Sequence, residues 1–362
     1  MFTMQDYIYE EKEVLSTILK KNDFSTREHM KKTVNLLILA TGSSYNACLA
    51  AKPALESYGD LTVDIQEPFY FSHYGKLSPS IDTVIAVSQS GKSASTVEAV
   101  KMIQKQGLPV VAITNDVQSP LALEAAQIID LGAGVESVGF VTKGYSATVL
   151  QLLLLGIGIG ISKNKISKKI EQDYMQQLRK IINHLPAIIQ KTEEFFDGYQ
   201  SLFRLAQRFV TIGYGPNWGT AKEAETKLTE TIRVPSQGFE LEAYMHGPYL
   251  EADASHLLFF IEGESVNKER SQKLQRYMSR YVGETLTITT KKARNEKTLG
   301  LAIECDEYLS ILALVVPFQL FAYKIAAAKG IDLNKKIFED FDTVLKLSLI
   351  HISEPTRHSL IS

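Results

Sequence analysis

The stretch that decides the fold is residues 82–93, Asp82-Thr83-Val84-Ile85-Ala86-Val87-Ser88-Gln89-Ser90-Gly91-Lys92-Ser93. Its first half is an apolar, β-branched run, which is typical of a buried strand. Its second half, residues 88–93, places hydroxyl groups and a glycine where a helix would begin. Free backbone N–H groups and the positive end of the helix dipole favour a phosphate ester at such a turn. A capped helix without a ligand would carry the same residues, because serine is a preferred N-cap.

Composition narrows the class of protein. The 362 residues are 45% hydrophobic and 22% charged, enough for one large core or two ordinary ones. The formal net charge of -2 gives no broad basic field, which argues against nucleic-acid binding.

Cys48 and Cys305 lie far apart without metal-site spacing, which suits a reducing cytosol. The polar N-terminus has no signal sequence, and the apolar runs 149–161 and 309–321 are too short to span a bilayer. We therefore expect a cytoplasmic protein without a membrane partner.

Strand and helix patterns alternate along the chain with short connections. This alternation predicts an α/β fold of doubly wound parallel sheets covered by helices on both faces. The connection at 166–200 differs, because it is rich in lysine and helical throughout. We predict strands at 35–40, 61–66, 83–87, 109–114 and 128–131 in the first half, and at 209–214, 257–261, 285–289 and 301–304 in the second.

The two halves resemble each other. Each has a strand, a glycine turn, an aromatic residue and a helix, so that Gly42 and Tyr45 match Gly215 and Trp218. A repeat this long indicates two tandem domains. The second half has Glu262-Gly263-Glu264-Ser265 at the position of the serine loop, so we expect one phosphate site per chain, in the first half. The predicted organisation is a helical segment at 1–34, a first domain at 35–165, the connection at 166–200, a second domain at 201–335 and a tail at 336–346.

The last residues, 347–362, read like a translated sequencing adapter: Leu347-Ser348-Leu349-Ile350-His351-Ile352-Ser353-Glu354-Pro355-Thr356-Arg357 and beyond. We expect this segment to be non-native and exclude it from functional interpretation, His351 included.

Two further hydroxyl-rich turns occur, at 41–44 and 141–144. Ligands of open α/β sheets bind at the carboxyl ends of the strands, where the turns at 41–44 and 88–93 are expected. Neither the Walker spacing nor a dinucleotide fingerprint is present. Hydroxyl and backbone N–H groups without an obligatory metal favour a sugar phosphate, so we expect no metal and no cofactor. The candidate residues are Gly42, Ser43, Ser44, Ser88, Gln89, Ser90, Ser93, Thr142 and Lys143.

The second half supplies a possible acid–base pair. Glu230 lies near the end of a predicted helix, and His246 lies in a loop flanked by glycine and proline. A carboxylate and an imidazole can move protons between adjacent sugar carbons and open a sugar ring. A surface glutamate and a structural histidine would leave the same pattern. Further candidates are Lys227, Arg233 and Glu242, of which Lys227 and Arg233 are equally compatible with ordinary helix charges.

Four motifs in order resemble the sugar isomerase (SIS) family: residues 42–46, 88–91, 142–143 and 242–248. The greatest similarity is to double-SIS proteins related to the isomerase half of glucosamine-6-phosphate synthase, over about residues 33–346. The resemblance implies two tandem three-layer SIS domains. It also implies Glu230 as the catalytic base and a ring-opening His246 from the neighbouring subunit, so that a homodimer would be the catalytic unit. The residues implied to hold the substrate phosphate are Ser43, Ser88, Gln89, Ser90 and Ser93.

The sequence departs from that synthase in two respects. The sequence does not begin with a cysteine, and we expect no glutaminase domain. Asp340 or Phe341 stands where the synthase has a Schiff-base lysine. A Glu/His pair without this lysine resembles the deglycases that split fructoselysine, glucoselysine or fructose-asparagine 6-phosphate into glucose 6-phosphate and an amine. We therefore expect a deglycase or isomerase acting on a 6-phosphorylated amino sugar or Amadori-type sugar. A glucosamine-6-phosphate deaminase or isomerase and a non-catalytic sugar-phosphate sensor are the alternatives.

Overall fold

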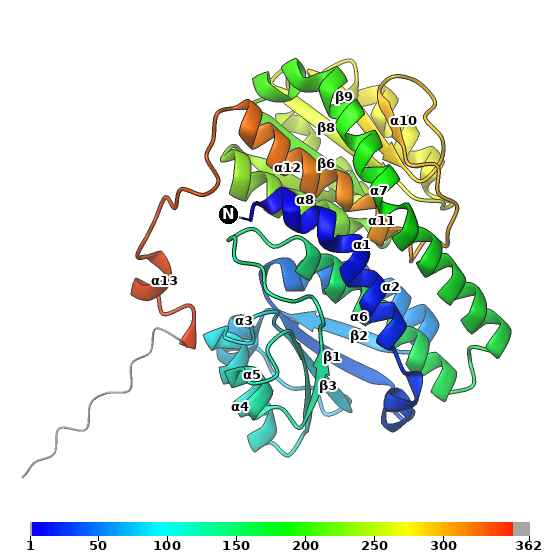
Figure 1. The fold of residues 1–362 in the computed structure, drawn as a ribbon, viewed down its shortest axis with the longest axis vertical. Helices are drawn as coiled ribbons and strands as arrows, with labels where there is room; N and C mark the ends of the chain where they lie inside the picture. Colours follow the sequence, from blue (N-terminus) through cyan, green and yellow to red (C-terminus); the bar gives the residue numbers. More distant parts are fainter. Residues whose placement is uncertain (1, 350–362) are drawn as a thin grey trace, which may run out of the picture.

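The computed structural model describes residues 2–349, and the predicted α/β class is confirmed. Each half contains a five-stranded parallel sheet between helices (Figure 1). The strand order is β2-β1-β3-β4-β5 in the first sheet and β7-β6-β8-β9-β10 in the second, so the two topologies are the same. The strands are β1 (Asn35–Ala40), β2 (Thr62–Gln66), β3 (Thr83–Val87), β4 (Val110–Thr114), β5 (Gln127–Asp130), β6 (Arg208–Gly213), β7 (Ser236–Glu240), β8 (His256–Glu262), β9 (Glu284–Thr289) and β10 (Thr298–Gly300).

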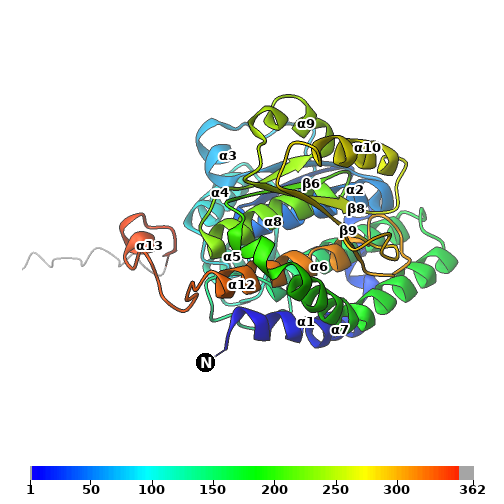
Figure 2. The same ribbon diagram turned by 90° about the horizontal axis from the view of Figure 1, so that it is seen from above.

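Helices cover both faces of each sheet. Figure 2 shows α1, α7 and α12 on one side of the molecule and α3, α9 and α10 on the other. The helices of the first half are α1 (Met4–Lys21), η1 (Phe24–Met30), α2 (Gly42–Gly59), α3 (Pro68–Tyr74), α4 (Ala94–Lys105), α5 (Pro120–Glu124) and α6 (Lys143–Ser162). Those that follow are α7 (Lys168–Leu205), α8 (Asn217–Ile232), α9 (Leu241–Met245), η2 (Pro248–Glu251), α10 (Lys268–Met278), α11 (Ile311–Leu314), α12 (Val316–Ala328) and α13 (Phe341–Val344).

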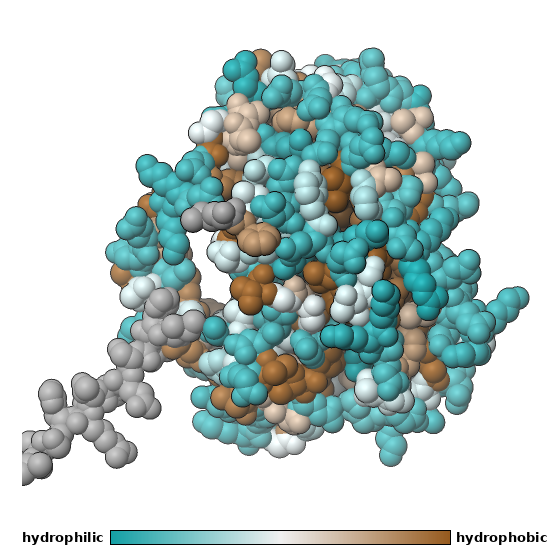
Figure 3. Space-filling model, in the orientation of Figure 1, coloured by the Kyte–Doolittle hydropathy of each residue, from teal (hydrophilic) through white to brown (hydrophobic). Residues whose placement is uncertain are grey.

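The alternation of side chains along each strand separates the cores. In β1, Leu36 and Ile38 face a large core that runs through both halves, whereas Leu37 and Leu39 face a smaller core under α4. A third core lies on the outer face of the second sheet. Because the large core contains residues of both halves, the two domains share it. The surface seen in Figure 3 is mainly hydrophilic, with hydrophobic atoms showing between polar ones.

Two strand predictions fail in the second half. The strand predicted at 301–304 is wrong, because the pairing with β9 occurs earlier, at Thr298–Gly300. Strand β7 was not predicted, since Ser236, Gln237 and Gly238 carry little apolar signal. It pairs with β6 alone, at the edge of the sheet, where one partner strand and few apolar side chains suffice.

Two segments, Lys143–Ser162 and Ile311–Ala328, are long and apolar enough to be candidate membrane spans. They are 94% and 78% buried inside the protein, however, so both serve as core helices. The second segment is interrupted between α11 and α12, where Pro317 lies in the first turn of α12.

Helices α2 and α8 cross at a glycine. Asn46 of α2 bonds to Glu223 and Thr226 of α8, while Ala50 of α2 lies opposite Gly219, so the helices run antiparallel. A Cβ on Gly219 would lie 2.2 Å from the backbone nitrogen of Ala50. Only a glycine allows this close approach of the two domains.

Replacing Gly219 by alanine is expected to lower the free energy of unfolding by about 1–3 kcal/mol, because the helices must move apart. Gly198→Ala in α7 is the matched control, since a Cβ there meets nothing within 4 Å. It should instead stabilise the protein by up to about 1 kcal/mol through helix propensity. Urea unfolding of both variants tests the contact, and equal effects of the two substitutions would contradict it.

Candidate functional site

Two turns meet at the carboxyl edge of the first sheet. Ala40 of β1 pairs with Val87 of β3, so the turns at 41–44 and 88–93 begin side by side, as expected for this strand order. Gly91 has φ +64°, and a Cβ there would lie 2.0 Å from the Ser119 hydroxyl. The loop therefore requires glycine at this position.

Hydroxyl groups line the second of these turns. Ser90 Oγ accepts from the backbone N–H of Lys92 at 3.3 Å, and Ser93 Oγ accepts from Thr96 at 3.0 Å. Ser88 is buried, whereas Ser90 is exposed. Leu347 and Ser348 pair with Ala94 and Ser93, but they belong to the segment predicted to be non-native, and we give this contact no functional role. His351 lies outside the described residues.

A cavity of about 580 Å³ opens beside this turn. Gln89 lies at its wall, close to Gly144, where an added Cβ would be 2.7 Å from the amide of Gln89. The buried Nε2 of Gln89 has no hydrogen-bond partner among the described residues. The cavity also borders Ser90, Lys92, Asn115, Asp116 and Glu136.

Helix α8 of the second domain brings three charged residues to the same edge. Asn46 Nδ2 donates to Glu223 Oε2 at 2.9 Å, and the Ser43 hydroxyl lies near enough to this carboxylate to favour its charged form. Because α8 runs antiparallel to α2, Lys227 and Glu230 follow beyond the N-terminus of α2. Candidate residues of the two halves, Ser43 and the pair Lys227 and Glu230, are thereby connected through Glu223.

The charges form a line from the interior to the surface. Lys227 Nζ donates to Glu230 Oε2 at 2.6 Å and lies 3.7 Å from Glu223 Oε1. The Glu223 and Lys227 side chains are 0% and 1% exposed, whereas that of Glu230 is 38% exposed. Glu230 is therefore the carboxylate of this line that a ligand can reach.

Burial and the neighbouring charges have opposite effects on the pKa values of Glu223 and Lys227. Burial raises the pKa of Glu223 to about 7, although Lys227 and Asn46 favour its charged form. Burial disfavours the charged form of Lys227, but Glu223 and Glu230 outweigh it and raise the pKa of Lys227. Lys227 thus stays protonated and holds the Glu230 carboxylate in place.

His246 lies away from Glu230 within one chain. It follows α9, with its side chain 73% exposed and Nε2 3.2 Å from Glu242, which also binds Arg270. Glu230 precedes β7 and His246 follows it, so they lie at opposite ends of a strand that spans about 16 Å. A single chain does not bring the predicted acid–base pair together.

The remaining candidates either contact other side chains of the chain or lie at the ends of helices. Lys143 Nζ binds Glu10 of α1 at 2.6 Å and lies over the ring of Tyr7, so it points toward α1. Thr142 is fully buried and donates from its N–H and hydroxyl to Glu136. Gly42 and Arg233 have positive φ at the start of α2 and the end of α8, and Ser44 is buried in the first turn of α2.

Sequence reasoning missed Glu223, Asn46 and Glu136. Glu223 lies four residues before Lys227 on the same helix face, a spacing that could have revealed it. Glu136 accepts from Thr142 and Gly144 at the start of α6 and borders the cavity, but its loop gives no periodic signal. No group of three His, Cys, Asp or Glu side chains suited to a metal occurs within residues 2–349.

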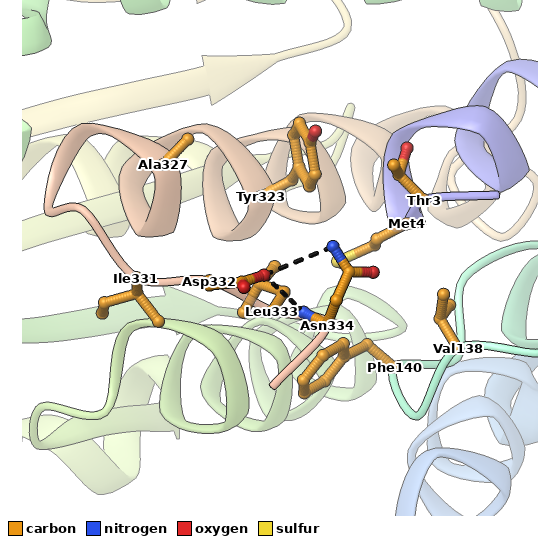
Figure 4. A pocket seen from close by; sticks show the side chains of 10 residues that line it. All are labelled: Thr3, Met4, Val138, Phe140, Tyr323, Ala327, Ile331, Asp332, Leu333 and Asn334. Atoms are coloured by element: carbon orange, nitrogen blue, oxygen red, sulfur yellow. Dashed lines mark hydrogen bonds between the residues drawn. The ribbon is translucent and has the colours of Figure 1, made fainter. Parts of the chain in front are cut away.

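A second, smaller cavity of about 120 Å³ lies between the start of α1 and the end of α12 (Figure 4). Its wall is mainly apolar, and Asp332 accepts hydrogen bonds from Asn334 of the same turn. It contains none of the predicted site residues.

Comparison with known protein families identifies one segment of the chain. The model of the SIS domain matches residues 29–158. This segment is a SIS domain, which confirms the resemblance found in the motifs.

Relatives are known over most of the chain. Glutamine–fructose-6-phosphate aminotransferases of Clostridium perfringens and Streptococcus mutans are 28% and 26% identical, over 92% and 90% of this chain. The chain spans about half the length of these relatives, 55% and 54%.

Solved structures show the same tandem fold. A protein from Clostridium difficile 630 that is provisionally assigned as a phosphosugar isomerase is 25% identical to this chain. Its structure has a TM-score of 0.86 and covers 95% of this chain and 98% of its own. The C-terminal domain of the glucosamine-fructose-6-phosphate aminotransferase from Francisella tularensis has a TM-score of 0.84 at 21% identity, over 91% of this chain and 96% of that domain. Both halves of the chain thus share the architecture of phosphosugar isomerases.

Replacing Lys227 by methionine is expected to lower the free energy of unfolding by about 3–5 kcal/mol, because Glu223 would lose its cation while buried. The double variant Lys227→Met/Glu223→Gln should recover much of this loss, since neither charge remains. Urea unfolding at pH 8 measures both. A double variant no more stable than Lys227→Met would contradict the pairing.

Proposed function

We propose that this protein is a sugar-phosphate deglycase of the isomerase type, acting on a 6-phosphorylated Amadori-type sugar. The observation that carries the proposal is Glu230, half-exposed and held by Lys227 at 2.6 Å, beside turns able to take a phosphate. The phosphate would lie at 88–93 and at Ser43, which places the far end of an open-chain sugar toward α8. In the proposal the enzyme is a cytoplasmic homodimer that needs no metal or cofactor.

The reaction follows from one proton moved between two carbons. Once the ring is open, Glu230 takes a proton from C1 of the fructosamine, and the electron pair forms a C1–C2 double bond. The C2 carbonyl oxygen takes a proton from water and becomes a hydroxyl. Return of the proton to C2 gives an imine between C1 and the amine nitrogen. Water adds to C1 and the C1–N bond breaks, which releases glucose 6-phosphate and the free amine.

The roles of the neighbouring groups follow from their positions. Lys227 donates to Glu230 and keeps its side chain oriented for the proton transfer. His246 would protonate and deprotonate the ring oxygen. Since β7 separates His246 from Glu230 of the same chain, the histidine in this mechanism comes from the partner subunit.

Purified protein incubated with fructoselysine 6-phosphate or glucoselysine 6-phosphate should release glucose 6-phosphate, followed with a coupled dehydrogenase. Glu230→Gln should lower kcat by about a hundredfold or more, because the amide cannot accept the proton. Arg233→Gln, at the end of the same helix, is the comparison variant, with an expected change of less than tenfold. Full activity of Glu230→Gln would refute the mechanism.

The same assay separates the alternatives. Ammonia and fructose 6-phosphate formed from glucosamine 6-phosphate, without turnover of the lysine adducts, would identify a deaminase. Tight sugar-phosphate binding without any product would identify a sensor.

The shared site can be tested by subunit mixing. Glu230→Gln and His246→Asn should each be nearly inactive alone. When subunits exchange at random, the mixture should regain about a quarter of wild-type activity, because half of the dimers carry one intact site. A mixture no more active than its two components would show that the residues do not combine across subunits.

A further inference from the structure

A buried polar cluster lies behind the candidate site, and the proposed reaction does not use it. It consists of Glu11 of α1, Ser146 of α6 and Gln319 of α12, with exposures of 1%, 0% and 0%. The three helices pack against one another here, on the side of the molecule where Figure 2 shows α1 and α12.

Two atoms of the cluster lack a partner. Ser146 Oγ donates to Glu11 Oε1 at 2.9 Å, and Gln319 Nε2 donates to the Thr142 carbonyl at 3.2 Å. Glu11 Oε2 and Gln319 Oε1 are both buried, and neither has a hydrogen-bond partner in the described part of the chain. Both are acceptors as long as Glu11 is ionised. Ser146 lies between the two side chains, because its Oγ also accepts from Gln319 Nε2 at 3.4 Å. One added proton would satisfy both atoms.

No cation compensates a charge on Glu11. Lys143 of α6 is bound to Glu10, and Lys324 of α12 is bound to Glu193 of α7. The charged group that acts on Glu11 is another carboxylate, Glu136, and within residues 2–349 no ion pair to Glu11 is present. Burial, with Glu136 adding to it, raises the pKa of Glu11 to about 8.

We propose that Glu11 carries a proton in the folded protein and donates it to Gln319, so that a neutral acid joins α1, α6 and α12 behind the site. The amide of Gln319 is then fixed with its N–H toward Thr142. Thr142 and Gly144 in turn bind Glu136, which borders the cavity. Glu11 is thus a positioning residue for the wall of the site. Its effect on turnover rests on the proposed function, but its protonation does not.

The pH dependence has a definite sign. The unfolded chain releases the proton as pH passes about 4.5, whereas the folded protein keeps it up to about pH 8. The contribution of Glu11 to stability is therefore complete below pH 4.5 and is lost as the pH rises to 8. A glutamine at this position would donate the same hydrogen bond without this loss.

The test compares wild type, Glu11→Gln and Glu11→Leu by urea unfolding between pH 5 and 8. The folding equilibrium constant of Glu11→Gln relative to wild type should rise by about tenfold per pH unit. Glu11→Leu should be less stable than both at pH 5, because Ser146 and Gln319 lose their partner. An infrared band of a protonated carboxyl should be present at pH 6 and absent in Glu11→Gln.

The proposal would be overturned if the ratio of the folding equilibrium constants of Glu11→Gln and wild type did not change with pH. It would also be overturned if the carboxyl band persisted in Glu11→Gln. If Glu11→Leu does not fold, the comparison of wild type with Glu11→Gln decides alone. These measurements need no substrate, so they stand even if the proposed reaction fails. Where turnover is found, kcat of wild type should fall above pH 8 and that of Glu11→Gln should not.

Discussion

The antiparallel contact between α2 and α8 is the constraint on which the rest of the structure depends. Gly219 lets the helices approach at Ala50, and Asn46 fixes the register by its bond to Glu223. If α8 were shifted by one helical turn along α2, Glu230 would lie either beyond the edge of the first sheet or beneath that edge. The crossing therefore joins two domains with a common core and also places second-domain charges beside the first-domain turns.

The two domains have the same topology, yet they are not equivalent at their carboxyl edges. Gly42 and Gly215 both take positive φ after the first strand of their sheet, at 58° and 54°. At the end of β8, however, Glu262 is buried and paired with Arg294, and Glu264 beyond the strand is paired with Lys291. Carboxylates paired with cations stand where the first half has its serine loop, so the repeat keeps its architecture while the two carboxyl edges differ in chemistry.

Buried ionisable groups surround the candidate site in two different ways. Glu223 lies against the cation Lys227, and the pair keeps the exposed Glu230 oriented. Glu11 has no cation, and its neighbours are a hydroxyl, an amide and the carboxylate Glu136. The cation Lys227 compensates the buried carboxylate of Glu223, whereas a bound proton neutralises Glu11. Each buried group must keep its partner, so both clusters constrain the helices that carry them.

The strong apolar periods of the sequence predict most strands and helices of both domains, and they locate the turns at 41–44 and 88–93. They miss the polar edge strand β7 and misplace β10, where few apolar residues mark the pairing. Only the tertiary structure decided which side chains meet. The crossing of α2 and α8 places Glu223 at the site, and packing of its loop places Glu136 there. Lys143 points toward α1, and strand β7 separates His246 from Glu230. Local patterns encode the elements, whereas these contacts depend on how distant elements pack.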